Sequence, residues 1–107
     1  MVFNKEKSSE NLFQDLIGCW KIDHGDIEAI KKYGSVQMIF DDEGNLRYGI
    51  RESDKLQIIN LTYKVMDNFL ITNQRGAPAE EKTEFILEDN KLVLIYKDQR
   101  SLFLKVK

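Results

Sequence analysis

Apolar and polar residues alternate over most of this chain, and this period of two is the feature that most limits its fold. From Ser35 onward, stretches of strand length carry an apolar side chain at every second position, which is typical of strands with one buried face. The apolar positions are Val36, Met38 and Phe40; Leu46, Tyr48 and Ile50; Ile59, Leu61, Tyr63 and Val65; Phe69 and Ile71; Thr83, Phe85 and Leu87; Leu92, Leu94 and Tyr96; and Leu102, Leu104 and Val106. The adjacent Ile58 and Ile59 predict a β-bulge, where a strand changes face.

The connections between these stretches indicate how the strands are joined. Most are short and rich in Asp, Asn and Gly, which tolerate the backbone conformations of tight hairpins; they lie at 41–45, 52–55, 66–68, 88–90 and 98–100. Two are longer, 75–80 and 24–34, and the second is open between a helical turn, an irregular lid and an extra strand. Consecutive hairpins predict an up-and-down sheet, and closure would remove its two free edges. We therefore predict an all-β fold: an up-and-down antiparallel barrel of about eight strands, forming a single domain over 1–107.

A different pattern precedes the first strand. Apolar residues fall on one face of a helix, and a Gly then ends it. After one further residue comes the only Trp of the chain, at the start of a strand. The residues are Leu12, Phe13, Leu16 and Ile17 for the helix face, then Gly18 and Trp20. A short N-terminal helix is therefore predicted, and Trp20 is expected to be a large core side chain with its N–H hydrogen-bonded.

This Gly-x-Trp sequence, after a helical segment and before about eight alternating strands, resembles the calycins, the lipocalins and fatty-acid-binding proteins. The resemblance covers about residues 12–106. It implies that Trp20 packs across one end of the barrel, that the helix closes this end, and that a basic residue of the last strand lies against the Trp. Arg100 precedes the last strand and Lys105 is expected to face opposite to Leu104, so neither is predicted to fill that basic position.

Composition excludes some classes of function. The chain has 107 residues and a formal net charge of −2, which disfavours nucleic acid, because nucleic-acid binding needs a basic face. A single Cys, Cys19, allows no internal disulfide. No signal-like leader and no apolar run of membrane-spanning length is present in the sequence. We therefore expect a cytoplasmic protein that binds neither nucleic acid nor membrane.

No set of residues in the sequence predicts catalysis or metal binding. His24 is the only histidine, and Cys19, five positions earlier, would point to the opposite face of a strand, which argues against a Cys–His pair. A calcium loop with Gly44 at its sixth position would place Ile39 and Ile50 as its first and last ligands, and both are apolar. We expect no enzyme activity, no cofactor and no metal.

The barrel interior is a candidate ligand site. Carriers of fatty acids hold the carboxylate with interior cations, whereas Arg47, Arg51, Lys64 and Lys105 all lie opposite in phase to the apolar positions. Burial of an unpaired carboxylate is strongly unfavourable, so fatty-acid capture is disfavoured. A small neutral apolar ligand stays open as an alternative to an interior filled by its own side chains, which the short chain favours.

Charge is unevenly distributed among the turns. In an up-and-down barrel alternate turns lie at the same end, and one set of alternate turns is acidic. Its members are Asp41, Asp42, Glu43, Asp67, Glu88 and Asp89. The acids have two interpretations: they are there because Asp forms turns well, or they form a docking rim for a basic protein.

These observations favour a non-enzymatic protein that binds a partner protein. In size, charge and lack of catalytic residues the chain is similar to small bacterial toxin-immunity proteins, including those of contact-dependent growth inhibition. That similarity implies neutralisation of a basic toxin or nuclease through the six acidic turn residues. The alternative is a lipocalin-like carrier of a small neutral apolar ligand.

Overall fold

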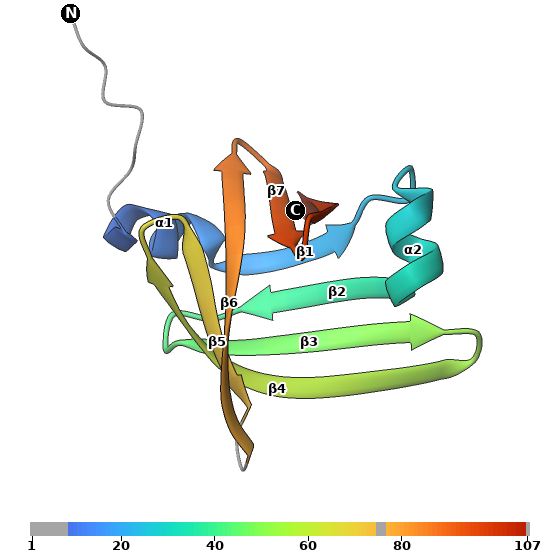
Figure 1. The fold of residues 1–107 in the computed structure, drawn as a ribbon, viewed down its shortest axis with the longest axis horizontal. Helices are drawn as coiled ribbons and strands as arrows, with labels where there is room; N and C mark the ends of the chain where they lie inside the picture. The colour runs from blue at the N-terminus through green and yellow to red at the C-terminus, as the bar shows by residue number, and fades with distance from the viewer. Residues whose placement is uncertain (1–8, 75–76, 107) are drawn as a thin grey trace, which may run out of the picture.

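The computed structural model describes residues 9–74 and 77–106, which form an antiparallel barrel of eight strands with two short helices (Figure 1). Each strand pairs with its neighbours in sequence, and β8 pairs with β1, so the ring is closed. The elements are α1 (Ser9–Leu16), β1 (Gly18–Ile22), α2 (Ile27–Tyr33), β2 (Ser35–Phe40), β3 (Asn45–Glu52), β4 (Lys55–Met66), β5 (Phe69–Gln74), β6 (Ala77–Glu88), β7 (Lys91–Tyr96) and β8 (Gln99–Lys105). The predicted up-and-down barrel with an N-terminal helix is confirmed.

The connections differ from expectation in three places. The 24–34 segment contains the helix α2, one of the open alternatives. The 75–80 connection is shorter than expected, because β6 begins at Ala77; residues 75–76 lie outside the described part of the chain. The predicted bulge at Ile58–Ile59 is wrong, since β4 pairs with β3 in continuous register through both residues. A shift in register is found instead between Thr72 and Gln74 of β5, where this strand pairs with β6.

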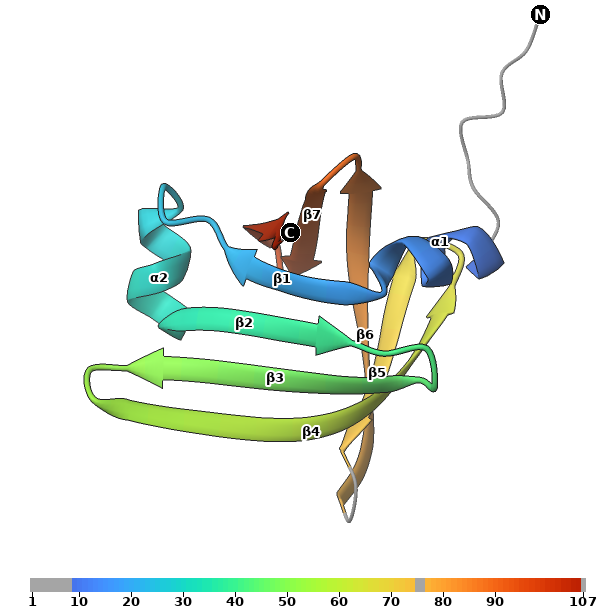
Figure 2. The ribbon, with the colours of Figure 1, turned by 180° about the vertical axis from the view of Figure 1, so that it is seen from behind.

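The barrel is strongly bent. Strands β1–β4 run side by side, and β5–β7 run across them on the other side of the ring (Figures 1 and 2). The long strands β4 and β6 make this possible. The first part of β4 pairs with β3 and its last part with β5, and β6 similarly pairs with β5 and then β7. Among residues 9–74 and 77–106, no helix is long and apolar enough to cross a membrane.

The core lies inside the ring and beneath α1. Its buried members come from every strand and from the helix, which explains why the alternating pattern is continuous along the chain. They are Leu16, Trp20, Ile22, Val36, Met38, Phe40, Leu46, Tyr63, Leu70, Phe85, Leu92 and Phe103.

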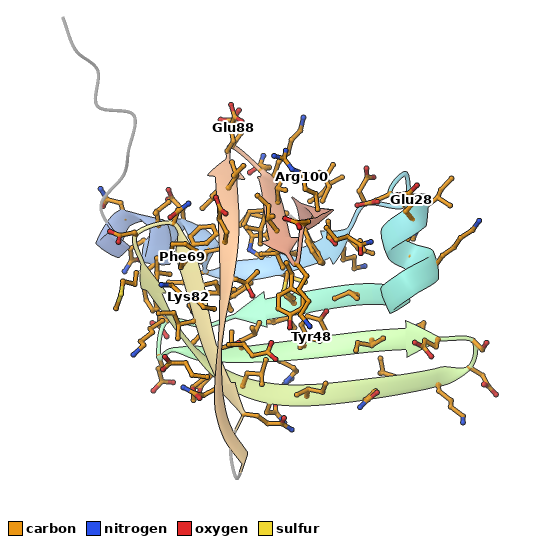
Figure 3. The ribbon with its side chains drawn as sticks, viewed as in Figure 1. Glu28, Tyr48, Phe69, Lys82, Glu88 and Arg100 are labelled. Carbon is orange, nitrogen blue, oxygen red and sulfur yellow. The ribbon has the colours of Figure 1, made fainter. Side chains whose placement is uncertain are left out.

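Strand β5 has the opposite face inward from the one predicted. Leu70 is buried in the core, so Phe69 and Ile71 point outward. Ile71 is nonetheless buried, because Lys64 and Lys82 flank it in the register and long lysine stems cover apolar surface well. The Lys82 Nζ lies 4.3 Å from the centre of the Phe69 ring (Figure 3). A lysine-covered apolar pair on the outside thus produced the same sequence pattern as an inward face.

Strand β8 is also reversed relative to expectation. Ser101 and Phe103 are buried, whereas Leu104 is 39% exposed and lies on the outside. The predicted inward set Leu102, Leu104 and Val106 is therefore wrong. Because side chains alternate along a strand, this reversal also turns Lys105 to the inner side.

Candidate functional site: the barrel cavity and its two ends

One end of the barrel is closed by α1 and Trp20. The Trp20 side chain is 0% exposed, and Leu16 above it is also 0% exposed. The indole Nε1–H donates a hydrogen bond of 2.8 Å to the Leu16 carbonyl, which satisfies one of the unpaired carbonyls at the helix C-terminus. Phe13 of α1 stacks on Tyr63 with ring centroids 5.3 Å apart. The helix is therefore fixed over this end both by apolar contact and by a directional bond.

Lys105 completes the closed end, contrary to prediction. It pairs with Trp20 across the β1–β8 ladder, and its Nζ lies 5.4 Å from the centre of the Trp20 ring, within the range of a cation–π contact. Gly18 makes room for it: a Cβ there would meet the Lys105 Cε at 3.0 Å, and the Gly18 φ of +133° suits few other residues. The Gly-x-Trp spacing therefore serves a three-residue arrangement that includes the last strand.

The six predicted partner-binding acids all lie at this closed end, because sequential antiparallel strands bring alternate turns to the same end. Asp42, Glu43, Asp67, Glu88 and Asp89 are exposed, whereas Asp41 is half-buried. The turns are arranged around α1, with the β6–β7 turn at its top and the β2–β3 turn below (Figure 1). Glu88 stands at the tip of β6 (Figure 3). The acids thus share an end but lie in three separate turns.

Asp41 has a structural role in the β2–β3 turn. Its carboxylate accepts hydrogen bonds from the Asn45 backbone N–H at 2.8 Å, the Glu43 N–H at 2.9 Å and the Asn45 side chain at 3.1 Å. These bonds, the Asn45 backbone bond first, lower the pKa of Asp41 below its ordinary 3.8. The Asp41 carbonyl accepts a 2.6 Å hydrogen bond from the Tyr63 hydroxyl. Burial, and then the charges of Asp41 and Asp42, raise the pKa of Tyr63.

Replacement of Asp41 by Asn should make the free energy of unfolding less dependent on pH in the acid range. The carboxylate has a lower pKa in the folded state than unfolded, so its hydrogen bonds stabilise the fold above the ordinary pKa of 3.8 and are lost as pH falls through the folded value. The amide introduced by Asp41→Asn keeps an acceptor but does not titrate. We expect the urea midpoint of the native chain to drop more steeply than that of the variant below about pH 4. Parallel curves from neutral pH to about pH 2 would contradict this role.

A cavity of about 390 Å³ occupies the interior between the closed end and the opposite end. The side chains at its floor belong to the packed core, so the core fills the end of the ring beneath α1 and the cavity lies towards the other end. Its inner part is apolar and buried, lined by Val36, Met38, Leu46, Leu70 and Phe103. A volume of this size suits a small organic ligand.

The outer part of the cavity is polar. It is lined by the hydroxyl-bearing residues Thr72, Thr83, Ser101, Tyr48 and Tyr96, and by Gln74, Glu81 and Gln99. Gln74 ends β5, Tyr96 ends β7 and Gln99 begins β8, so these side chains mark the end opposite α1. Tyr48 is seen pointing into the space enclosed by the strands (Figure 3). Since Tyr96 is 38% exposed, the polar part reaches solvent and forms the mouth.

The basic residues of the strands lie outside the cavity, whereas one acidic residue lines it. Arg47, Arg51 and Lys64 do not line the cavity, as their sequence phase predicts. Lys105 points inward but lies at Trp20, beyond the cavity floor. Among the described residues that line the cavity, Glu81 is the one whose side chain is charged at neutral pH. The lining therefore offers hydrogen-bond donors and acceptors with a single negative charge.

Several residues of the cavity and of the closed end were not predicted from the sequence. Thr72 and Gln74 were missed because β5 was assigned the wrong face. Glu81 shares the alternation of Thr83 and Phe85, so the same period of two could have extended the inward set to it. For Lys105 the available signal was Phe103, which alternates with Ser101 and is larger than any of the leucines chosen instead.

The remaining candidate residues form no reactive centre. The Cys19 sulfur accepts a 3.0 Å hydrogen bond from the Gln37 side chain, and His24 is exposed in the β1–α2 connection. Within residues 9–74 and 77–106, no three His, Cys, Asp or Glu side chains gather closely enough to hold a metal ion. Comparison of the chain with protein-family models, curated proteins and solved structures gives no match.

Proposed function

We propose that this protein is a non-enzymatic binding barrel that holds a small, mostly apolar ligand in its interior cavity. The observation that carries the proposal is the cavity of about 390 Å³, with an apolar floor and a mouth rich in hydroxyl and amide groups. Ligand sites commonly combine an apolar lining with a few polar groups that fix orientation. The helix-closed end, with Trp20 beneath α1 and Lys105 over its ring, agrees with what the calycin resemblance implies.

The charges around the cavity favour a neutral or cationic ligand over an anionic one. Glu81 lines the mouth, and the basic residues of β3 and β4 lie outside the wall. A carboxylate drawn into this cavity would lose water without gaining a cation, which is unfavourable. A neutral alcohol or amide could pair with Thr, Ser and Gln side chains, and an ammonium group could pair with Glu81.

A competition experiment tests this proposal. The neutral fluorophore N-phenyl-1-naphthylamine is titrated into the protein and then displaced by decanol, decylamine or decanoate, which share one chain length. We expect binding of the probe, and displacement by decanol and decylamine at concentrations about ten-fold or more below that of decanoate. Decylamine should displace the probe at a lower concentration than decanol, because its ammonium group can pair with Glu81, and with Glu81→Gln this difference should disappear. A protein that binds no probe, or that prefers decanoate, contradicts the proposal.

Docking of a basic protein at the closed end is the second candidate. It is favoured by five exposed carboxylates in three turns of that end, from Asp42, Glu43, Asp67, Glu88 and Asp89, and complementary charge accelerates and directs association. An immunity protein against a basic toxin or nuclease would act in this way.

Capture of partners from the source cells, with the native chain and with Asp42→Lys/Glu43→Lys as bait, tests this second function. This pair leaves Asp41 and its turn intact. A basic protein retained only by the native chain is the expected result. Equal retention by both baits would remove this turn from the interface.

A further inference from the structure

The outer face of β1–β4 carries a groove of about 370 Å³, whose described lining shares Ile22 and Val36 with that of the cavity (Figure 2 faces this side of the ring). Its floor is Gly49 in the middle of β3, where the absence of a side chain leaves a hollow. Gln37 of β2 and Ile58 of β4 are the register partners of Gly49 on either side. We call this feature the β3 groove and define it by Ile39, Arg47, Gly49, Arg51, Leu56 and Ile58.

The walls of the β3 groove are apolar and exposed. Leu56 is 55% exposed, Ile58 53% and Ile39 39%. Isolated apolar side chains on a surface are common, but neighbouring ones around a hollow mark an interaction site. These residues lie on the outer face, so they contribute nothing to the barrel core.

The charge of the β3 groove is of one sign. Arg47 and Arg51 flank Gly49 on the same face of β3, and Lys21 also lines the groove, whose described lining contains no Asp or Glu. Within the described residues, neither Arg47 nor Arg51 forms an ion pair. This concentration of positive charge stands against the overall net charge of −2, since most of the described carboxylates lie in the connections between strands and on β6.

We propose that the β3 groove binds an extended acidic segment of a partner protein. Arg47 and Arg51 are four positions apart on a strand, which separates them by about 13 Å. A bound segment in extended conformation has the same rise, so two Glu or Asp four positions apart would each meet one arginine, in charge-assisted pairs. The residue midway between them would face Gly49 and place an apolar side chain between Leu56 and Ile58.

The pairing of β3 decides the mode of recognition. Strand β3 is hydrogen-bonded to β2 on one side and to β4 on the other, so a partner above Gly49 finds no free edge of β3 to join through its backbone. Binding at this face must therefore use side chains. Apolar walls beside two arginines fit a peptide better than a nucleic acid, whose backbone would leave these walls uncovered. A membrane is also a poorer fit, since these apolar residues border a hollow.

The test uses the labelled peptide Thr-Glu-Thr-Leu-Thr-Glu-Thr, with blocked ends, and backbone amide NMR shifts of the full chain. We expect saturable shifts at 47–51 and 56–58. Replacement of both Glu by Gln, or of Leu by Ala, should weaken binding by about ten-fold. The proposal is independent of the cavity, so the naphthylamine probe should bind unchanged in the presence of the peptide.

Two protein variants localise the site. Arg47→Glu/Arg51→Glu should weaken the peptide by about ten-fold or more, whereas Lys91→Glu/Arg100→Glu, the same charge change on the outer face of β7 and β8, should not. Gly49→Val should also block binding and leave the fold intact. A Cβ there would meet nothing closer than the Gln37 carbonyl at 3.8 Å, and Gly49 is not in the left-handed region.

Other results would overturn the proposal. Equal loss with both charge-reversal pairs would indicate non-specific attraction. Binding of phosphatidylserine vesicles or single-stranded DNA, but not the peptide, in a manner abolished by Gly49→Val would assign the groove to another class of partner. Self-association of the native chain that Gly49→Val abolishes would identify the occupant as a second copy.

Discussion

Replacement of Trp20 by Ala should destabilise the fold by about 3–5 kcal/mol, the range for loss of a buried aromatic side chain. Trp20 is fully buried and touches the three components of the closed end: α1 through its indole N–H, the core through its ring, and β8 through Lys105. The deletion would leave a cavity beneath Leu16 and an unpaired carbonyl at the helix end. Urea unfolding followed by far-ultraviolet circular dichroism measures the change.

Two further variants separate packing from hydrogen bonding. Trp20→Phe retains most of the ring but removes the donor to Leu16, so it should cost about 1–3 kcal/mol. Tyr96→Ala removes an aromatic side chain at the exposed mouth and should cost about 1 kcal/mol or less. If Trp20→Ala were no more destabilising than Tyr96→Ala, α1 and Trp20 would not form the closure described.

Thr83→Phe should abolish ligand binding while the barrel remains folded. Thr83 lies opposite Leu70 in the β5–β6 ladder and lines the cavity between its apolar floor and its polar mouth. A phenyl ring there would occupy space that the ligand needs. We expect the affinity for N-phenyl-1-naphthylamine to fall by about a hundred-fold, measured by fluorescence titration.

The matched control is Thr62→Phe. Thr62 pairs with Asn45 and Asn73 on the outer side of β4, and it does not line the cavity. The same substitution there should leave the affinity within about two-fold of the native value. Circular dichroism of both variants establishes that they are folded. Undiminished binding in a folded Thr83→Phe would place the probe outside the barrel.

The strand order of the barrel could be predicted from the sequence because it depends on local signals. Short turns rich in Asp, Asn and Gly force neighbouring strands to pair, and the alternation supplies one buried face for each. The helix before Gly18 and the position of Trp20 follow from the same kind of local pattern. These features therefore require no knowledge of distant contacts.

The inward faces of β5 and β8 could not be obtained in this way. In β5, Phe69 and Ile71 are apolar but lie outside under lysine stems, whereas the inward positions include Thr72 and Gln74. In β8 apolar residues occupy both faces, so alternation alone does not choose between Leu104 and Phe103. Only the pairing with β1 and β7 decides, and that pairing depends on the complete ring.

The site was less predictable than the fold. The acidic turn residues were correctly expected to share an end, but the hydrogen bonds that bind Asp41 within its own turn depend on the conformation of 41–45. The cavity depends on the diameter of the ring and on which side chains leave its centre empty. The β3 groove depends on Gly49 having apolar neighbours from β4, which is a property of register between strands.

The pairing of β1 with β8 has a consequence for how the molecule assembles. The remaining strand pairs join neighbours in sequence, whereas the β1–β8 pair brings Trp20 against Lys105, which lies near the other end of the sequence. Contacts between distant segments form slowly, since they must overcome a large loss of chain entropy. The only tryptophan of the protein lies in this β1–β8 pair. Its intrinsic fluorescence should therefore report the pairing that closes the barrel, after the hairpins have formed.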